Sequence, residues 1–464
     1  MTRHLLTLAS SALFALGSAI AADKPNIIYI LLDDAGYGDF SCYGQEKFQT
    51  PNIDKLATEG MQFTDHYSGS TVCAPTRSVL MTGLHTGHTP IRGNSEVKPV
   101  GQKPLPADTL TIAKLLKQHG YATGAFGKWG LGYPGSEGDP LNQGFDRFYG
   151  YNCQRNAHTY YPTWLYDDKT KITLDGKTYS HTLIMDECLA WIKEQGSDKK
   201  APFFCYLPIT IPHAAMHVPE KYAAPFRKKF PQFENKIGRY AGPNVRNPAA
   251  MFAGMMTLLD EDIGRLMSLI KDLGIDDNTV VMFTSDNGAH REGGHMPDFF
   301  NSNGGMRGHK RALSEGGIRT PLLVRWPGTI KAGSKSEHIS AHWDVFPTLC
   351  EISGTETPGG LDGISYLPEL LGKPQKKHAY LYWEFMEQGG KRALRFGKDG
   401  QWKAIQLKAS KNKDAPIALY NLKKDPREEK DVSKQHPELI DTVKKTFDKA
   451  RTTNDTFKFN WEKK

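Results

Sequence analysis

A cysteine and an arginine four residues apart stand at the start of a predicted helix. The stretch Val72–Gly83 is VCAPTRSVLMTG, in which Pro75 suits the first helical turn and Gly83 suits the helix end. Cys73 then lies at the helix N-terminus, where free backbone N–H groups favour an anion, and Arg77 lies one turn later on the same face. These groups together form a site for an oxyanion, and we take a sulfate ester as the substrate they indicate.

Carboxylates follow two apolar segments that are typical of strands buried on both faces. The segments are Asn26–Leu32 and Thr279–Thr284, and the polar residues after them are Asp33, Asp34, Asp286 and Asn287. In open α/β sheets ligands bind at the carboxyl ends of the strands, so these side chains should meet. Their oxygens suit one Ca²⁺, and Mg²⁺ less well, rather than zinc. For Asp33 and Asp34 taken alone, a turn in which an Asp serves as a cap explains the residues as well as a metal site does.

Two further predicted strands end in residues that could bind an anion or transfer a proton. Tyr121–Phe126 is followed by Lys128 between glycines, and Pro202–Ile211 is followed by His213. The alternatives are an ordinary solvated lysine and a structural histidine. Lys310 ends a glycine-rich loop and is a third candidate.

Several loops carry polar residues that could contact a substrate. Residues 133–180 are rich in Gly, Pro and Tyr, and within them His158 lies beside aromatic residues, as in many sugar-binding clefts. A packed loop core explains this segment equally well. Our candidates for substrate contacts elsewhere are Arg92, His290, His295 and Glu384.

Length and composition indicate a globular protein. The 464 residues are enough for one large domain and a smaller one, and 39% hydrophobic with 24% charged residues argues against disorder. The formal net charge of +8 would suit an anionic substrate, but a basic solvated surface is the favoured explanation, because Lys-rich segments lie towards the C-terminus. We find no internal repeat and no nucleic-acid-binding motif.

Residues 1–21 are typical of a secretory signal peptide. Arg3 and His4 precede a largely apolar run, and residues 19–21 fit a small-x-small cleavage site. The run is short for a transmembrane anchor. No cysteine follows it directly, so we do not expect a lipoprotein anchor. The mature protein is therefore expected in the periplasm or outside the cell, without a membrane anchor.

The six cysteines are scattered and show no C-x-x-C spacing, which argues against a zinc site or a thioredoxin motif. Export would permit disulfides. If Cys73 is committed to chemistry, at least one of the other five stays unpaired. Cys205 lies in an apolar strand and is expected to be a small buried hydrophobe.

The order of the predicted elements indicates an α/β fold, with a large mixed, mostly parallel sheet sandwiched by helices. Near residues 354–363 the composition changes to Gly, Pro and Thr, and short apolar runs separated by turns follow. These runs and a final helix at Pro437–Lys449 predict a smaller C-terminal subdomain of antiparallel sheet plus helix. The expected boundaries are 22–355 for the α/β domain and 356–464 for the subdomain.

Together the motifs resemble the formylglycine-dependent type I sulfatases, arylsulfatase-like proteins of the alkaline-phosphatase-like superfamily. The resemblance runs from Asn26 to about Trp326, and its strongest part is Cys73-x-Pro75-x-Arg77. Each remaining motif is weak alone, but chance does not explain all of them in the family's order. These motifs are Asp33-Asp34, Gly127-Lys128-Trp129, Pro212-His213, Asp286-Asn287-Gly288, and Lys310 ahead of Glu315-Gly316-Gly317.

The resemblance implies a role for each motif residue. Cys73 would be oxidised by a formylglycine-generating or sulfatase-maturing enzyme to formylglycine, whose hydrate is the nucleophile. Arg77 would hold the hydroxyl of the nucleophile. The residues implied to bind one Ca²⁺ are Asp33, Asp34, Asp286, Asn287 and residue 73. Those implied to bind the sulfate oxygens are Lys128, Lys310 and His213, of which His213 would also protonate the leaving alcohol.

One position departs from the family pattern. Many members carry a histidine two residues after the motif lysine, where this chain has Gly130. That histidine is usually assigned to the release of sulfate, so either another group substitutes for it or the step is slower. His158 is the first candidate, because it lies in the next loop, and His85 and His88 are weaker ones.

Three functions are compatible with the sequence. The first is an exported sulfatase, a sulfuric ester hydrolase, acting on a sulfated carbohydrate; the export signal, the aromatic insertions, Glu384 and Glu387 favour it. The second is a phosphate or phosphonate monoester hydrolase of the same superfamily, although such enzymes often have two metals or more histidine ligands. The third is a catalytically inactive glycan-binding homologue in which Cys73 is never converted.

Overall fold

The computed structural model describes residues 24–198 and 200–463. The predicted signal peptide, residues 1–21, lies outside the described residues. Among the helices of the described part, none combines the length and the hydropathy that a membrane span needs.

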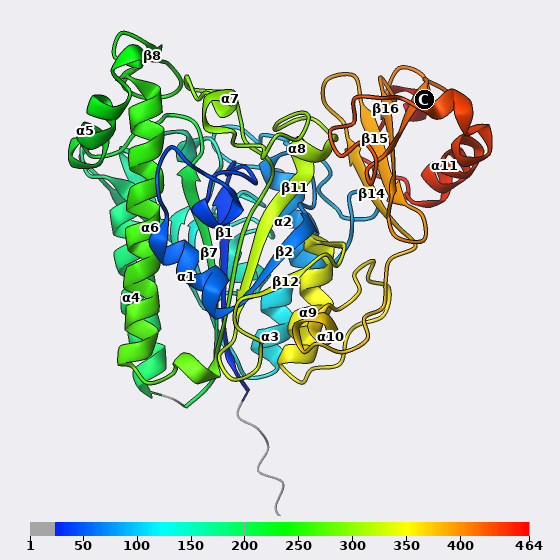
Figure 1. Ribbon diagram of the computed structural model, residues 1–464. Helices are drawn as coiled ribbons and strands as arrows, with labels where there is room; N and C mark the ends of the chain where they lie inside the picture. Colours follow the sequence, from blue (N-terminus) through cyan, green and yellow to red (C-terminus); the bar gives the residue numbers. More distant parts are fainter. Residues whose placement is uncertain (1–23, 199, 464) are drawn as a thin grey trace, which may run out of the picture.

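A large mixed sheet organises most of the chain (Figure 1). Its central strands β10, β1, β7, β3 and β4 are parallel, and antiparallel strands flank them on both sides. The predicted mixed, mostly parallel sheet is confirmed. In spatial order its strands are β12 (Ser334–Ser336), β2 (Met61–Tyr67), β11 (Arg319–Arg325), β10 (Thr279–Ser285), β1 (Asn26–Asp33), β7 (Phe203–Pro212), β3 (Ala122–Lys128), β4 (Arg147–Tyr151), β5 (Trp164–Asp167) and β6 (Thr170–Thr173), with β13 (Ser340–Ala341) beside β2.

Side chains of β1 alternate between two hydrophobic cores, one on each face of the sheet. Ile28, Ile30 and Leu32 enter one core, and their neighbours on the other face enter the second. All residues of β1 are buried, as a strand covered by helices on both faces requires. The helices on the first face are α1 (Pro51–Glu59), α4 (Ser180–Asp198) and α6 (Pro248–Asp272), and those on the second are α2 (Cys73–Thr82), α3 (Ile112–Gln118), α9 (Val345–Ile352) and α10 (Leu367–Leu370).

Shorter elements decorate this unit. The segment 133–180, expected to be rich in loops, contains the strands β4, β5 and β6. β6 is mostly exposed, so it lacks the apolar pattern that identifies a buried strand. The other short elements are α5 (Glu220–Lys229), the hairpin of β8 (Ile237–Gly238) and β9 (Val245–Arg246), α7 (Pro297–Phe300) and α8 (Glu315–Ile318).

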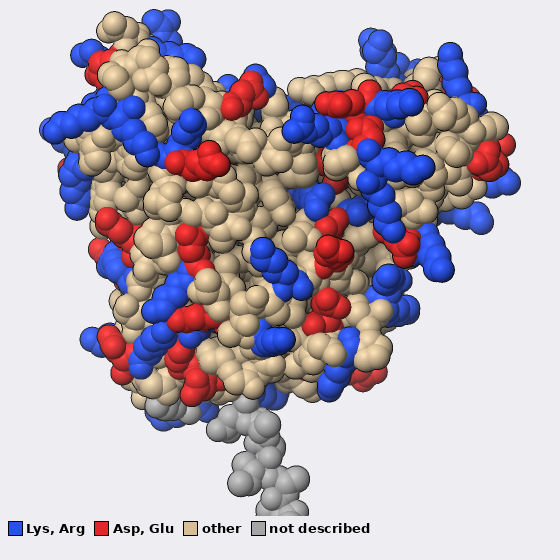
Figure 2. Space-filling model, in the orientation of Figure 1, with Lys and Arg blue, Asp and Glu red and all other residues tan. Residues whose placement is uncertain are grey.

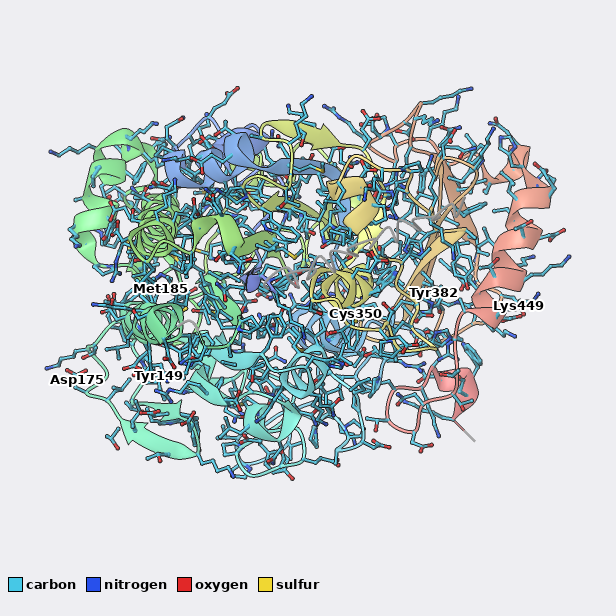
Figure 3. The ribbon with its side chains drawn as sticks, turned by 90° about the horizontal axis from the view of Figure 1, so that it is seen from below. Tyr149, Asp175, Met185, Cys350, Tyr382 and Lys449 are labelled. Carbon is cyan, nitrogen blue, oxygen red and sulfur yellow. The ribbon has the colours of Figure 1, made fainter. Side chains whose placement is uncertain are left out.

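A second, antiparallel sheet follows in the C-terminal part, as predicted. α11 (Pro437–Lys449) packs on this sheet and has the predicted bounds. Seen from below, Tyr382 and Lys449 of this part lie on the side opposite Tyr149 and Asp175, with Cys350 of α9 between them (Figure 3). The strands are β14 (Tyr380–Phe385), β15 (Lys391–Phe396), β16 (Trp402–Leu407) and β17 (Ile417–Asn421). The boundary at residue 355 stays a prediction.

Charged side chains of both signs are interspersed over the face shown in Figure 2, and several basic ones lie over the C-terminal part. This distribution agrees with a basic solvated surface. The six cysteines are free thiols. Cys205 is completely buried, as predicted, with its sulfur 3.6 Å from that of Cys188.

Candidate active site

Strand ends and one helix start meet at the carboxyl edge of the parallel strands (Figure 1). α2 begins at Cys73 and is followed by Gly83, whose φ of +68° closes the helix. Strands β1 and β7 are in register with Asp33 opposite Pro212, and β3 ends at Lys128. The predicted helix start and the predicted strand ends therefore lie together.

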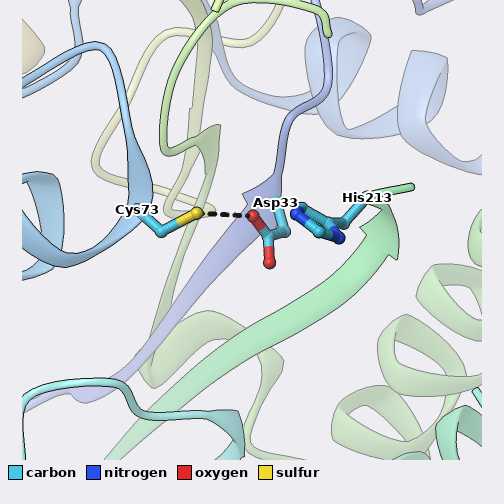
Figure 4. Close-up of side chains that lie close together, drawn as sticks. All are labelled: Asp33, Cys73 and His213. Atoms are coloured by element: carbon cyan, nitrogen blue, oxygen red, sulfur yellow. Dashed lines mark hydrogen bonds between the residues drawn. The ribbon is translucent and has the colours of Figure 1, made fainter. Parts of the chain in front are cut away.

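The Asp33 carboxylate contacts both the thiol of Cys73 and the amino group of Lys128 at this edge of the sheet. Its Oδ1 accepts a hydrogen bond from Cys73 Sγ at 3.4 Å, and its Oδ2 accepts one from Lys128 Nζ at 2.6 Å. Figure 4 shows this carboxylate between the thiol and the ring of His213. Burial alone would raise the pKa of Asp33, but Lys128, followed by His213 and Arg77, holds that pKa well below its usual value. Asp33 is therefore an anion in the core of the site.

The Cys73 side chain is held as a thiol. It is buried, and burial followed by the charge of Asp33 raises its pKa, although Lys128 Nζ lies 3.3 Å from Sγ. A thiol in this state is a poor nucleophile. The position suits an attacking group, but the unmodified sulfur does not.

Three carboxylates crowd one another beside Cys73. Oxygens of Asp33, Asp34 and Asp286 lie within 4.8 Å of one another. Asp34 adopts the left-handed φ of +68°, its N–H donates to Asp286 Oδ1 at 3.0 Å, and its Oδ1 accepts from Asn287 Nδ2 at 2.7 Å. Burial, followed by the charge of Asp33, raises the pKa of Asp286 to about 8. Burial and the charge of Asp33 therefore disfavour the ionised form of Asp286 more than the nearby cations favour it.

The chemistry of this group fits a hard divalent cation. Asn287 Oδ1 is buried and has no hydrogen-bond partner within the described part of the chain. That oxygen and the carboxylate oxygens of Asp33, Asp34 and Asp286 form the kind of all-oxygen set that Ca²⁺ takes. A cation would also offset the repulsion that raises the pKa of Asp286.

Arg77 is buried beneath the cluster. Its Nη1 donates to the Lys128 carbonyl at 2.5 Å, and its Nη2 donates to Asp286 Oδ2 at 3.2 Å. The guanidinium therefore connects the end of β3 with the end of β10.

His213 and Lys310 both contact Asp34. The Nδ1 of His213 is 3.2 Å from the carbonyl of Ala214 and its Nε2 is 3.6 Å from Asp34 Oδ2. Lys310 Nζ donates to Asp34 Oδ2 at 2.7 Å and lies 3.4 Å from Glu292 Oε2. Burial, followed by Lys310, lowers the pKa of His213 well below its usual value. Glu292 is a contact that the sequence analysis missed, because it follows no strand and belongs to no motif.

His158 lies against His213. The two rings are nearly parallel, with centroids 5.2 Å apart and an interplanar angle of 13°. Tyr240, from the loop between β8 and β9, packs edge-on against both, at 5.3 Å and 5.7 Å. Burial, followed by the charge of Lys128, lowers the pKa of His158 to about 4. The structure thus brings His158 to the site, and it adds Tyr240, which carries no sequence signal beyond being aromatic.

The space beside Gly130 is filled by another side chain. Gly130 has a φ of +78°, and a Cβ on it would lie 2.6 Å from Cγ of Gln154. Gln154 Nε2 donates to Asn94 Oδ1 at 3.4 Å. A histidine at position 130 would therefore require Gln154 to move and would adopt a strained backbone conformation.

Two of the expected substrate contacts lie elsewhere. Arg92 Nη1 donates to Glu384 Oε1 at 3.2 Å and to the Thr452 carbonyl at 2.8 Å, while Arg451 Nε donates to the second Glu384 oxygen at 2.8 Å. Arg92 and Glu384 are both buried. Their contacts join the large α/β part to the C-terminal part, so this arrangement does not favour the predicted contact with substrate.

The remaining candidate histidines fall into two groups. His290 Nε2 is 3.2 Å from the Pro212 carbonyl, next to His213, whereas His295 packs on Phe252 with centroids 4.1 Å apart and an interplanar angle of 33°. His85 and His88 form a separate pair with Asp362, whose carboxylate lies 2.9 Å from His88 Nδ1. His85, His88 and Asp362 contact one another rather than the carboxylate cluster.

The chain is similar over most of its length to several known proteins. A family model described as Sulfatase matches residues 25–355, and one described as N-sulphoglucosamine sulphohydrolase, C-terminal, matches residues 307–453. Arylsulfatase A of Homo sapiens is 31% identical, and the match covers 94% of this chain and 89% of that protein. N-acetylgalactosamine-6-O-sulfatase of Bacteroides thetaiotaomicron is 29% identical, with 93% of this chain and 94% of that protein covered.

Solved structures give the same fold. The crystal structure of Ps i-CgsB in complex with k-i-k-neocarrahexaose superposes with a TM-score of 0.78 at 29% identity, covering 92% of this chain and 93% of that chain. The phosphonate monoester hydrolase of Agrobacterium radiobacter shares the fold with a TM-score of 0.65 at 22% identity, covering 92% and 95% of the two chains.

Proposed function

Because the chain belongs to the sulfatase family, within the alkaline-phosphatase-like superfamily, we propose that it is an exported sulfatase that removes sulfate from a sulfated carbohydrate, using one Ca²⁺ and a formylglycine made from Cys73. Members of this family hydrolyse sulfate esters, and the chain is accordingly a sulfuric ester hydrolase. The observation that carries the finer proposal is the position of Cys73, at a helix start and within reach of both Asp33 and Lys128.

Formylglycine and Ca²⁺ would supply what the unmodified site lacks. Asp33, Asp34, Asp286, Asn287 and residue 73 would hold the cation, whose positive charge favours negative charge on the sulfate oxygens. Conversion of Cys73 by a sulfatase-maturing enzyme would replace a thiol of raised pKa by an oxygen nucleophile.

The other residues bind the substrate and handle its protons. Lys128 and Lys310, whose side chains are 0% and 4% exposed, attract the sulfate oxygens and offset the charge that develops there. Arg77 holds the end of β3 against Asp286 and orients the nucleophile's hydroxyl. His213 gives a proton to the leaving alcohol. Burial and the charge of Lys310 keep its pKa low before substrate binds, and the negative charge of a bound sulfate raises that pKa, so that the ring can carry the proton it transfers.

His158 is our candidate for the role of the family histidine that Gly130 replaces. It reaches the site beside His213, and at neutral pH its low pKa leaves it uncharged and able to accept a proton. Gln154 excludes a side chain from position 130, which supports a substitution from another loop.

The substrate class follows from relatives and from the rim of the site. Named relatives act on N-acetylgalactosamine 6-sulfates, and one structural neighbour is in complex with a neocarrahexaose. Tyr240, 40% exposed beside His213, offers a ring against which a sugar can pack. A secreted or periplasmic enzyme would meet such saccharides outside the cytoplasm.

A screen of defined sulfated saccharides tests the proposal. The protein is co-produced with a sulfatase-maturing enzyme and incubated with each saccharide, an aryl sulfate, and the matching phosphate and phosphonate monoesters, and released anion is measured. We expect sulfate from at least one saccharide and little or no product from the phosphorus esters. Faster hydrolysis of a phosphorus ester, or no sulfate from any compound, would overturn the proposal.

A further inference from the structure

Arg311 occupies the rim of the site directly after Lys310. Lys310 turns inward to Asp34, whereas the Arg311 side chain is 32% exposed and lies beside Glu292. The backbone N–H of Arg311 donates to the Thr71 carbonyl at 3.0 Å, two residues before Cys73. Arg311 is therefore fixed between the helix that begins at Cys73 and the lysine that faces the sulfate group.

The backbone at this position is held in a conformation that arginine rarely adopts. Its φ is +73°, in the left-handed region that favours glycine. Its carbonyl accepts a hydrogen bond from Lys391 Nζ at 2.6 Å, and Lys391 comes from β15 of the C-terminal sheet. The fold therefore retains a large cationic side chain at a site where glycine would cost less, and the C-terminal sheet helps to hold it there.

The guanidinium of Arg311 has most of its donors available. Within the described part of the chain it makes one side-chain hydrogen bond, from Nη1 to Glu292 Oε1 at 2.6 Å. An arginine carries five N–H donors in a planar fork that matches a carboxylate or a sulfate group. Glu292 is itself shared, because its other oxygen lies 3.4 Å from Lys310 Nζ.

We propose that Arg311 binds a second anionic group of the saccharide, a sulfate or a uronate carboxylate, while the first sulfate is bound by Lys310 and its neighbours. This inference rests on the proposed function and adds a specificity-determining residue to it. The partial exposure of the side chain lets a substrate group reach it. Because Arg311 and Lys310 both contact Glu292, we expect the two anionic groups on the same or adjacent sugar residues.

Ligand affinity tests the inference without turnover. In the Cys73→Ala background, calorimetry measures the binding of three saccharides that share the scissile sulfate: one singly sulfated, one with a second sulfate, and one with a uronate. Arg311→Ala should weaken binding of one or both doubly charged saccharides by about 10-fold or more relative to the singly sulfated one. The saccharide whose affinity falls shows whether the second group is a sulfate or a carboxylate.

Three further variants serve as controls for this measurement. Arg311→Gly suits the positive φ and removes the same side chain, so it separates loss of the guanidinium from misfolding. Arg311→Lys keeps the charge without the fork and should give an intermediate loss. The matched control is Arg291→Ala, since Arg291 is 52% exposed and pairs with Asp298 at 2.8 Å; it should leave the affinities unchanged.

Equal affinity losses for singly and doubly charged saccharides, or none, in both Arg311→Ala and Arg311→Gly would overturn the inference. Hydrolysis of the singly sulfated saccharide by the converted wild-type enzyme is measured in parallel. Its failure would count against the proposed function, whereas a missing difference between the saccharides counts against Arg311 alone.

Discussion

Asp286 and Glu315 are both completely buried carboxylates, but their surroundings differ. Asp286 lies among other carboxylates at the end of β10, and burial, followed by Asp33, raises its pKa to about 8. Glu315 lies between the two sheets and accepts hydrogen bonds from Lys403 Nζ at 2.7 Å and from the Tyr67 hydroxyl at 2.5 Å. Burial would raise its pKa, but Lys403, with Arg395 and Arg319, lowers it to about 2.

The comparison separates a ligand site from a structural charge cluster. Cations of the protein hold the pKa of Glu315 low, whereas at Asp286 the charges of Arg77 and Lys128 do not offset burial and the charge of Asp33. Asn287 Oδ1 has no hydrogen-bond partner in the described chain. Buried charge alone therefore does not indicate function. A buried carboxylate whose charge the neighbouring cations do not offset does, because folding would disfavour its ionised form unless a bound ion stabilised it.

The largest expected effect concerns Glu315. Glu315→Gln leaves Lys403 buried without its partner, so the free energy of unfolding should fall by about 3–5 kcal/mol. Urea denaturation followed by circular dichroism measures it. Turnover per folded molecule should stay near the wild-type value; a stable but inactive variant would show that this cluster is not merely structural.

Asp286→Asn should lower turnover without lowering stability, which is the reverse of the effect expected for Glu315→Gln. Removing one of the repelling carboxylates leaves the stability of the metal-free protein, measured in EDTA, equal or higher, but turnover should fall by about 10²–10³-fold, as for the loss of one preorganised electrostatic group. Steady-state kinetics and thermal unfolding on the same preparation measure both. Loss of stability with unchanged turnover would show that Asp286 has a structural role and does not belong to a ligand site.

Glu428 is the exception within the structural cluster and gives a pH test. Burial raises its pKa to about 7, although Lys403 lowers it, and Glu315 and Arg307 are its other charged neighbours. The folded state then binds the proton more tightly than the unfolded chain, so stability should fall as pH rises from about 4.5 to 7, by about 1.4 kcal/mol per pH unit at most. Glu428→Gln should remove this slope in thermal unfolding from pH 5 to 8. An identical slope in the variant would refute the assignment.

On the catalytic side, His158→Ala should lower turnover by roughly 10²-fold, the low end of what a positioned acid or base supplies. His217→Ala is the matched control, because His217 is also buried nearby but bonds the Pro243 carbonyl at 2.9 Å. Wild-type turnover in His158→Ala would contradict its role.

The smallest expected effect is that of chelation. A ligand that binds only the folded state stabilises it by about 1.4 kcal/mol at ten times its Kd. EDTA should therefore lower the Tm of the wild type, and less so that of Asp286→Asn. Equal shifts in both proteins would argue against Asp286 as a ligand.

The sequence predicted the positions that follow from strand ends. Asp33, Lys128, His213 and Asp286 each come directly after a buried apolar run, and parallel strands bring such ends to one edge. The helix start at Cys73 was predicted from Pro75 and Gly83 for the same kind of local reason. The mixed sheet and the C-terminal antiparallel sheet followed from the spacing of apolar runs.

Contacts between distant loops were not predictable from local pattern. Arg92 and Glu384 are 292 residues apart and form an ion pair that no spacing indicates. Gln154 fills the space at Gly130, and Tyr240 reaches His213 from a hairpin whose strands are two residues long. These contacts depend on how complete loops pack against one another. The spacing of apolar residues within one segment does not describe such packing.

The mass of the peptide that contains residue 73 tests the central claim most directly. Protein purified from its native host, or co-produced with a sulfatase-maturing enzyme, is digested and analysed by mass spectrometry. We predict that an aldehyde replaces the thiol of Cys73, and that its hydrate is detected beside it. An intact thiol in the native protein would contradict the account and would favour a glycan-binding homologue without turnover.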